Sequence, residues 1–182
     1  MCIRDRNKGG AYEETAVLYR SNAQSRAIEE ALLRISIPYR IYGGLRFYER
    51  LEIKNAIAYL RIIFNNNDNP SFERSISNPT RGVGEKTLGK IRNTAKKYNI
   101  SYIKASAKLI DEGSISGRGG SGLRDYLEFV AGCKNFIEEN NLSELMELII
   151  KESGLYAYHA KEAGEKGKTR TENLEELSLI HI

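Results

Sequence analysis

The chain has 182 residues, a net charge of +4 and 41% apolar residues, which is enough for the hydrophobic core of one domain or two small ones. No run approaches the roughly 18 apolar residues of a membrane span and no signal peptide is visible, so we expect a cytosolic protein that does not contact membranes. Cys2 and Cys133 lie far apart without metal-type spacing, and His159 and His181 have no ligand partners nearby. We therefore expect neither a disulfide nor a metal site.

The first third of the chain has the pattern of a strand, a helix and a second strand. Thr15–Arg20 is a short apolar run of strand type, and Ser21 followed by Gln24 matches a helix-capping box. The helix that follows carries an apolar face of Ile28, Ala31, Leu32 and Ile35. Ile37–Tyr42 alternates like a second strand. This pattern predicts part of a parallel α/β sheet, and because two strands are marginal alone, we expect the other strands elsewhere.

The rest of the chain is helical in pattern. Leu51–Phe64 is the strongest helix, with an apolar stripe of Ile53, Ile57, Leu60 and Phe64 that Ala56, Tyr59 and Ile63 widen. Ser114–Gly122 is rich in glycine and serine, which predicts a flexible loop or a weaker second hairpin. The other predicted helices are Ser71–Ser77, Glu85–Lys97, Tyr102–Leu109 after a cap at Ser101, Leu123–Glu139, Leu145–Lys151, and a last one from about Thr171.

A glycine turn precedes the helix that begins at Glu85. Gly82 and Gly84 flank Val83, and because glycine has no Cβ, the backbone here can turn tightly and approach a partner closely. The first amides of the following helix have no internal acceptor and suit an anionic oxygen. From Ile76 the pattern resembles the helix-hairpin-helix element that binds nucleic-acid backbones. The predicted contacts to duplex phosphates are Arg81, the Gly82-Val83-Gly84 turn with the amides of Gly84 and Glu85, Lys86 and the Thr87 hydroxyl.

Positive charge is concentrated around this turn. From Arg74 to Lys108 the chain carries nine cations against one acid, Glu85, a local excess of +8 that is larger than the net charge of the whole chain. A short basic run taken alone is compatible with a solvated helical face. Coupled to the glycine turn, it favours a polyanionic partner such as nucleic acid.

Five segments in order resemble the UvrD/Rep/PcrA-type superfamily 1 DNA helicases, over roughly Lys8 to Leu177. The segments are Ala16–Arg26, Pro38–Gly44, Phe47–Lys54, Thr80–Gly84 and Gly164–Leu177. The resemblance implies an α/β then mostly α chain. Residues 11–72 would be part of the second motor domain, and residues 73–177 part of a helical accessory domain with the helix-hairpin-helix element. Met1–Arg6 and Ser178–Ile182 match nothing in the family, and we interpret them as non-native ends.

The resemblance further implies that the chain is an internal fragment of an ATP-dependent 3′ to 5′ DNA helicase. ATP and Mg would serve the full-length parent and would not bind this fragment, so we expect no catalytic residue and no ATP hydrolysis by the isolated chain. The implied partners are double-stranded and single-stranded DNA and the remaining motor domain of the same parent, in the bacterial cytoplasm at the nucleoid.

The resemblance also gives Arg50 a role, which is to contact the single strand along which the motor moves. A helix-start ion pair is an equal alternative for this residue. Gly167-Lys168-Thr169 spells the end of a phosphate-binding loop, but Glu162 occupies the position where that loop needs its first glycine. Two other functions stay open: a free-standing helix-hairpin-helix DNA-binding module without a motor, and a helical protein-interaction domain whose basic face meets an acidic partner.

Overall fold

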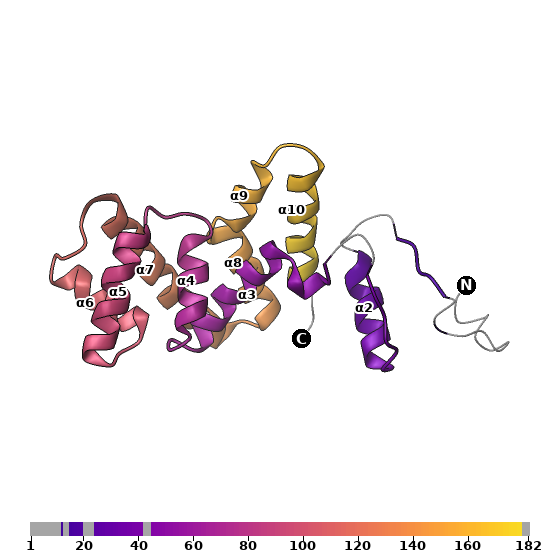
Figure 1. Cartoon of the computed structure of the whole chain (residues 1–182), viewed down its shortest axis with the longest axis horizontal. Helices are drawn as coiled ribbons and strands as arrows, with labels where there is room; N and C mark the ends of the chain where they lie inside the picture. Colours follow the sequence, from indigo (N-terminus) through magenta and orange to yellow (C-terminus); the bar gives the residue numbers. More distant parts are fainter. Residues whose placement is uncertain (1–11, 13–14, 20–23, 42–44, 180–182) are drawn as a thin grey trace. The chain divides into compact units, whose positions relative to one another are not determined.

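The computed structural model describes residues 12, 15–19, 24–41 and 45–179. It divides into two compact units, residues 1–47 and 48–182, which are described separately below. Over these described residues the regular elements are helices (Figure 1). Their bounds are α2 Ser25–Arg34, the 3-10 helix η3 Phe47–Glu49, α3 Leu51–Phe64, α4 Asn69–Ser77, α5 Glu85–Tyr98, α6 Tyr102–Asp111, α7 Gly117–Glu139, α8 Leu142–Glu152, α9 Leu155–Ala160 and α10 Glu165–Ser178.

The predicted α/β class is wrong for the part of the chain that the structure describes. Residues 15–19 and 37–41 adopt no strand, and the described residues form no sheet. The physical reason is that an extended segment becomes a strand only when a neighbour takes up its backbone donors and acceptors, and a pair of strands without further neighbours is marginal. The end of the first predicted strand, Ser21 of the predicted capping box, and Tyr42–Gly44 lie outside the described residues.

Helix α2 forms as predicted, but its apolar face is not buried. Ile35 is 62% exposed and Leu33 is exposed as well, whereas the buried positions of the helix are Ser25 and Glu29. The Glu29 carboxylate accepts hydrogen bonds from the Phe47 amide at 3.3 Å and from the Tyr39 hydroxyl at 3.3 Å. Polar contacts therefore tie the first unit together.

Helix α3 organises the second unit. Its predicted bounds are confirmed. It packs against α4, α7, α8 and α10, so more of its surface is buried than the single apolar stripe predicted (Figure 1). Tyr59 lies at its centre, with its ring 6.1 Å from that of Tyr126 and 5.9 Å from that of Phe129. Phe64, which was predicted to face the core, is 61% exposed.

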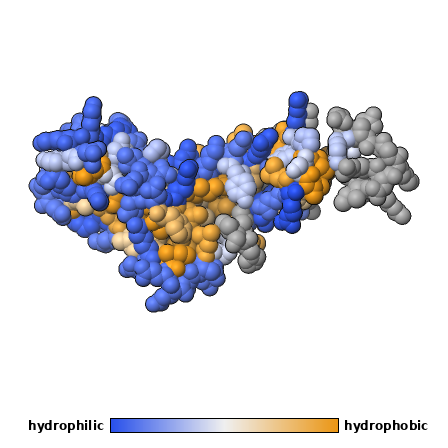
Figure 2. Space-filling view, turned by 90° about the horizontal axis from the view of Figure 1, so that it is seen from below, coloured by the Kyte–Doolittle hydropathy of each residue, from blue (hydrophilic) through white to orange (hydrophobic). Residues whose placement is uncertain are grey.

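The α4–turn–α5 element predicted from the glycine pattern is present in the structure. Asp68 caps α4 by accepting from the Ser71 amide, and Ser101 caps α6 by accepting from the Lys104 amide. Helix α5 begins at Glu85 directly after the turn and packs on α6, which in turn contacts α7. The end of the unit formed by α5 and α6 is mainly hydrophilic (Figure 2).

Other boundaries differ from the prediction. The glycine-rich segment predicted as a loop is helical from Gly117, and α10 begins at Glu165, ahead of the predicted Thr171. The predicted domain boundary after Phe72 falls inside α4, whereas the two compact units divide after Phe47. The domain assignment itself remains a prediction from the family resemblance.

Candidate nucleic-acid interface

The two glycines of the turn have different surroundings. Gly82 has φ +74, a conformation that residues with a side chain rarely adopt, and a Cβ there would lie 2.9 Å from the Arg118 Cγ. Gly84 has φ −92 and caps α5 from an exposed position, and a Cβ there would meet nothing within 4 Å. Gly82 is therefore required by the fold. Gly84 is not, which leaves its open face available to a ligand.

The start of α5 presents unbonded backbone amides at this open face. Thr87 and Leu88 are the first amides that donate back to the Gly84 carbonyl, at 2.9 and 3.0 Å, so the amides of Glu85 and Lys86 precede the intrahelical bonds. The side chain of Lys86 is exposed beside them. An anion at this position would meet backbone N–H groups, the positive end of the helix dipole and a lysine ammonium.

The first turns of α7 pack against the glycine turn. A Cβ on Gly122 would lie only 1.9 Å from the Arg81 carbonyl oxygen, so the two backbones are in direct contact. An open hollow of about 250 Å³ borders this contact, and its lining residues are Thr80, Arg81, Arg118, Ser121, Gly122 and Asp125. The packing of α7 against the glycine turn was not predicted from the sequence. The signal was present in the closely spaced glycines of residues 117–122.

Two cations of the basic stripe, Arg92 and Lys108, are paired with acids, and two of these acids, Glu73 and Glu112, lie just outside the counted segment. Arg92 donates to Glu73 at 2.6 Å, and this bond and the charge of Arg92 hold the pKa of the Glu73 carboxyl below its usual range. Arg92 is also paired with Glu85. Lys108 pairs with Glu112 at 2.7 Å. The exposed lysines of this stretch are Lys86, Lys90, Lys96, Lys97 and Lys104, with the Lys90 ammonium 2.8 Å from the Ser114 carbonyl. The usable charge is therefore smaller than the sequence count.

Arg81, predicted to contact phosphate, directs its guanidinium into the protein. Its Nη2 donates to the Tyr59 hydroxyl at 2.9 Å and to the Ser153 carbonyl at 2.9 Å. The guanidinium carbon lies 5.8 Å from the ring centres of both Tyr59 and Tyr126, and Nε is buried. A direct DNA contact by Arg81 remains a prediction, and it would require the side chain to share or release these partners.

Arg50, predicted to contact single-stranded DNA, is also inside the protein. It is 8% exposed, and its Nη1 donates to the Asn173 side-chain oxygen at 2.8 Å. The Asn173 amide nitrogen in turn donates to the buried Glu52 carboxylate at 2.6 Å. This arrangement joins the start of α3 to α10. The single-strand contact and the helix-start ion pair both stay predictions.

The same network continues to α9. Arg170 lies 3.7 Å from Glu52 and donates to Glu162 at 2.5 Å, and Glu162 is also 2.6 Å from the Nδ1 of the buried His159. The hydrogen bond from His159 and the pair with Arg170 hold the pKa of Glu162 below its usual range. Sequence reasoning did not find this network, because its members are spread over more than a hundred residues of chain.

The Gly167-Lys168-Thr169 triplet lies within α10 and does not fit a nucleotide. A Cβ on Gly167 would lie 2.3 Å from the Glu162 carbonyl oxygen, so its backbone is already against the protein. A phosphate-binding loop needs a glycine whose backbone is free to approach the phosphate, and the Gly167 backbone is already packed against Glu162. Over the described part of the chain, no group of three or more His, Cys, Asp or Glu residues is placed to hold a metal ion, and no described helix is long and apolar enough to cross a membrane.

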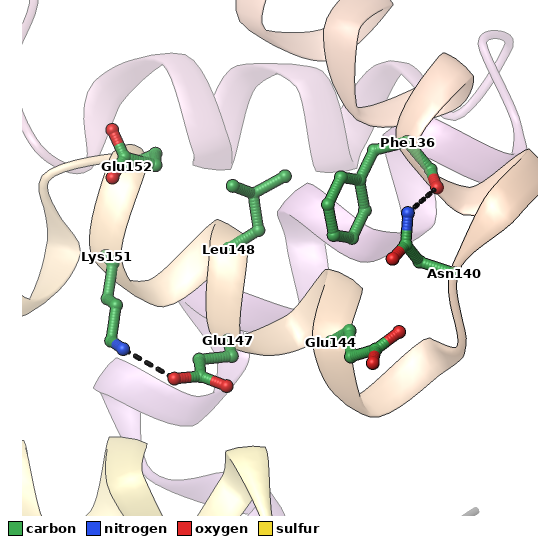
Figure 3. Close-up of a pocket in the computed structure, with 7 residues that line it drawn as sticks. All are labelled: Phe136, Asn140, Glu144, Glu147, Leu148, Lys151 and Glu152. Atoms are coloured by element: carbon green, nitrogen blue, oxygen red, sulfur yellow. Dashed lines mark hydrogen bonds and ion pairs between the residues drawn. The ribbon is translucent and has the colours of Figure 1, made fainter.

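A second hollow, of about 310 Å³, lies at the junction of α7 and α8 (Figure 3). Phe136 and Leu148 form its apolar part. Glu147 pairs with Lys151 at 2.5 Å, and Glu144 completes a capping box at the start of α8. Both carboxylates are thus engaged in helix stabilisation, and this hollow does not have the features of a catalytic site.

At the start of α5 an exposed glycine with free space around it thus lies beside backbone amides that precede the intrahelical bonds and beside exposed lysines. Residues 2–114 match the model of the UvrD-like helicase C-terminal domain, and the chain belongs to this family. The family predicted from the sequence is thereby confirmed.

The relatives are bacterial helicases. The chain is 47% identical over 171 residues to DNA helicase II of Escherichia coli (strain K12), an alignment that covers 94% of this chain and 24% of the relative. It is 48% identical over 169 residues to DNA helicase II of Haemophilus influenzae, covering 93% and 23%. It is 40% identical over 170 residues to the ATP-dependent DNA helicase PcrA of Leuconostoc citreum, again covering 93% and 23%. The chain thus spans about a quarter of the length of these relatives.

Proposed function

We propose that the chain is a segment of an ATP-dependent DNA helicase that moves 3′ to 5′, and that its helical part holds duplex DNA ahead of the motor. The family membership and the printed names of the relatives support the helicase assignment. The proposed location is the bacterial cytoplasm, at the nucleoid. ATP and Mg belong to the parent, whose motor domains would close around them, and no step of that chemistry is assigned to residues of this chain.

The open face of the glycine turn is the main observation that supports the duplex-binding role. Gly84 has free space where a Cβ would be, the amides of Glu85 and Lys86 precede the intrahelical bonds, and the Lys86 side chain is exposed. These groups suit a phosphate oxygen, and the residues proposed to contact the duplex are those of the turn and the first turn of α5, Gly82 through Thr87.

Binding of this type is independent of base sequence, because the groups involved meet phosphates and not base edges. It weakens with salt, since each neutralised phosphate of B-DNA contributes about 0.9 to the slope of log affinity against log salt. Arg50 is kept as the proposed single-strand contact of the motor part. That role requires Arg50 to exchange its bond with Asn173 for one with DNA.

The direct test is the salt dependence of binding to a short fluorescein-labelled duplex, measured by anisotropy between about 50 and 200 mM salt. Lys86→Ala should reduce the slope by about 0.9 at unchanged stability. Gly84→Ala should weaken binding because its methyl group occupies the open face. Gly89→Ala is the matched control, since a Cβ there also meets nothing within 4 Å but lies within α5, away from the turn. Equal affinities and slopes for the wild type and all three variants would refute the proposed interface.

The fragment assignment has a separate test. DNA-stimulated ATP hydrolysis should be absent from the isolated chain, because the Gly-Lys-Thr triplet lies within a helix and is packed against protein backbone. Turnover by the purified chain, at a level that follows the protein through a final sizing column, would overturn this assignment without affecting the duplex-binding proposal.

A further inference from the structure

The Arg81 side chain connects the glycine turn to three helices. Its guanidinium bonds to the hydroxyl of Tyr59 on α3 and to the carbonyl of Ser153 at the end of α8, and it lies near the ring of Tyr126 on α7. Gly82, the next residue, has a positive φ. The point at which the turn reverses direction is thus attached directly to the scaffold.

The Tyr59 hydroxyl extends this attachment to the beginning of the turn. It accepts from Arg81 at 2.9 Å and donates to the Asn78 carbonyl at 3.0 Å, so one hydroxyl joins residues on both sides of Thr80. Burial raises the pKa of Tyr59 to about 12, which keeps the hydroxyl protonated as a donor. Because the Tyr59 side chain is fully buried, it cannot itself touch a ligand.

The Ser153 carbonyl is a suitable partner for a cation. Ser153 is the C-cap of α8, where the carbonyl groups at a helix end carry partial negative charge. Both bonds come from one nitrogen, Nη2, whose two N–H groups have fixed directions in the plane of the guanidinium fork. A lysine ammonium is a point charge without this fork.

From these contacts we infer that Arg81 is a positioning residue. It binds no phosphate itself, and it holds the turn so that the Glu85 and Lys86 amides face the duplex. This inference rests on the proposed duplex-binding function, which it deepens by separating the residue that fixes the site from Lys86, which meets the charge. A direct phosphate contact by Arg81 and a positioning role of Arg81 predict different effects of substitution on duplex binding.

The experiment compares Arg81→Lys, Tyr59→Phe and Lys86→Ala in the full chain, with the salt titration described above. If Arg81 positions the turn, Arg81→Lys and Tyr59→Phe should each weaken duplex binding by roughly tenfold, the effect of losing a hydrogen bond to a charged group. Both should keep the wild-type salt slope, because no phosphate contact is lost. If Arg81 binds phosphate, lysine should preserve most of the affinity, and Tyr59→Phe should have little effect. That pattern would overturn the inference.

A measurement without DNA separates failure of this inference from failure of the proposed function. Amide hydrogen exchange at Thr87 and Leu88, whose amides donate to the Gly84 carbonyl, should be faster in Tyr59→Phe than in the wild type, while amides of α10 exchange at the wild-type rate. Faster exchange in Tyr59→Phe, combined with a wild-type chain that does not bind duplex, would refute the proposed function and leave the positioning role of Arg81 intact. Unchanged exchange at the turn would refute the positioning role, whatever the result with DNA.

Discussion

Replacing Gly122 by alanine tests the packing of α7 against the glycine turn. The added Cβ would lie 1.9 Å from the Arg81 carbonyl oxygen, whereas ordinary contact begins at 3.4 Å, so the two backbones must separate by about 1.5 Å. Neither atom belongs to a flexible side chain. Overpacking of this kind costs about 1–3 kcal/mol, and the gain in helix propensity from glycine to alanine returns about 1 kcal/mol. With the upper end of the overpacking range, we expect Gly122→Ala to lower the free energy of unfolding by about 2 kcal/mol.

The assay is urea unfolding followed by far-UV circular dichroism, with Gly132→Ala as the control on the same helix. A Cβ on Gly132 meets nothing within 4 Å, so this variant should gain up to about 1 kcal/mol from helix propensity alone. The midpoint of Gly122→Ala should fall while its m-value stays constant. Equal or greater stability of Gly122→Ala, relative to the wild type, would show that the close backbone contact does not exist in solution.

Three further predictions concern the core. Asn173→Ala should lower the free energy of unfolding by about 3 kcal/mol, since it removes the group that joins the buried Arg50 and Glu52, and chemical denaturation measures this loss. Burial raises the pKa of Tyr59 from 10.0 to about 12, so the folded state favours the neutral phenol. This preference contributes about 3 kcal/mol to the free energy of unfolding below pH 10, and the contribution is lost as the pH rises toward 12. Unfolding at increasing pH should show a shallower loss in Tyr59→Phe, and identical pH profiles would contradict this assignment. The buried thiol of Cys133, whose pKa burial raises to about 11, should react with a maleimide only after denaturant is added; rapid labelling of the native chain would be the contrary result.

Local sequence patterns predicted most of the helices of the second unit. The bounds of α3, the start of α5 after Gly84 and the cap of α6 at Ser101 all depend on apolar periodicity and capping chemistry that act within a few residues. The predicted strands failed because a strand depends on partners at long range, which the described residues do not provide. The helical start of α7 was missed for a related reason. Its glycines are unfavourable for an isolated helix, and two of them, Gly119 and Gly122, are in close contact with the turn.

The candidate site was located by the sequence but not resolved by it. The glycine turn and the exposed Lys86 were identified from their pattern, and their positions agree with that prediction. The direction of each arginine was not predictable. Arg50 and Arg81 are long side chains near a chain reversal or a helix start, and whether such a side chain faces solvent or the interior depends on acceptors from distant segments, here Asn173 and Ser153.

By itself, the sequence determined the family of this protein, its helical second unit and the place of the Gly82-Val83-Gly84 turn, because these are encoded in local periodicity and in contiguous motifs. Only the tertiary structure decided that Gly82 is required by the backbone and Gly84 is open, and that the cations of the stripe are unequal in availability. The reason is physical: burial, backbone contact and the pairing of charges are properties of residues brought together from different helices, and no stretch of sequence contains them.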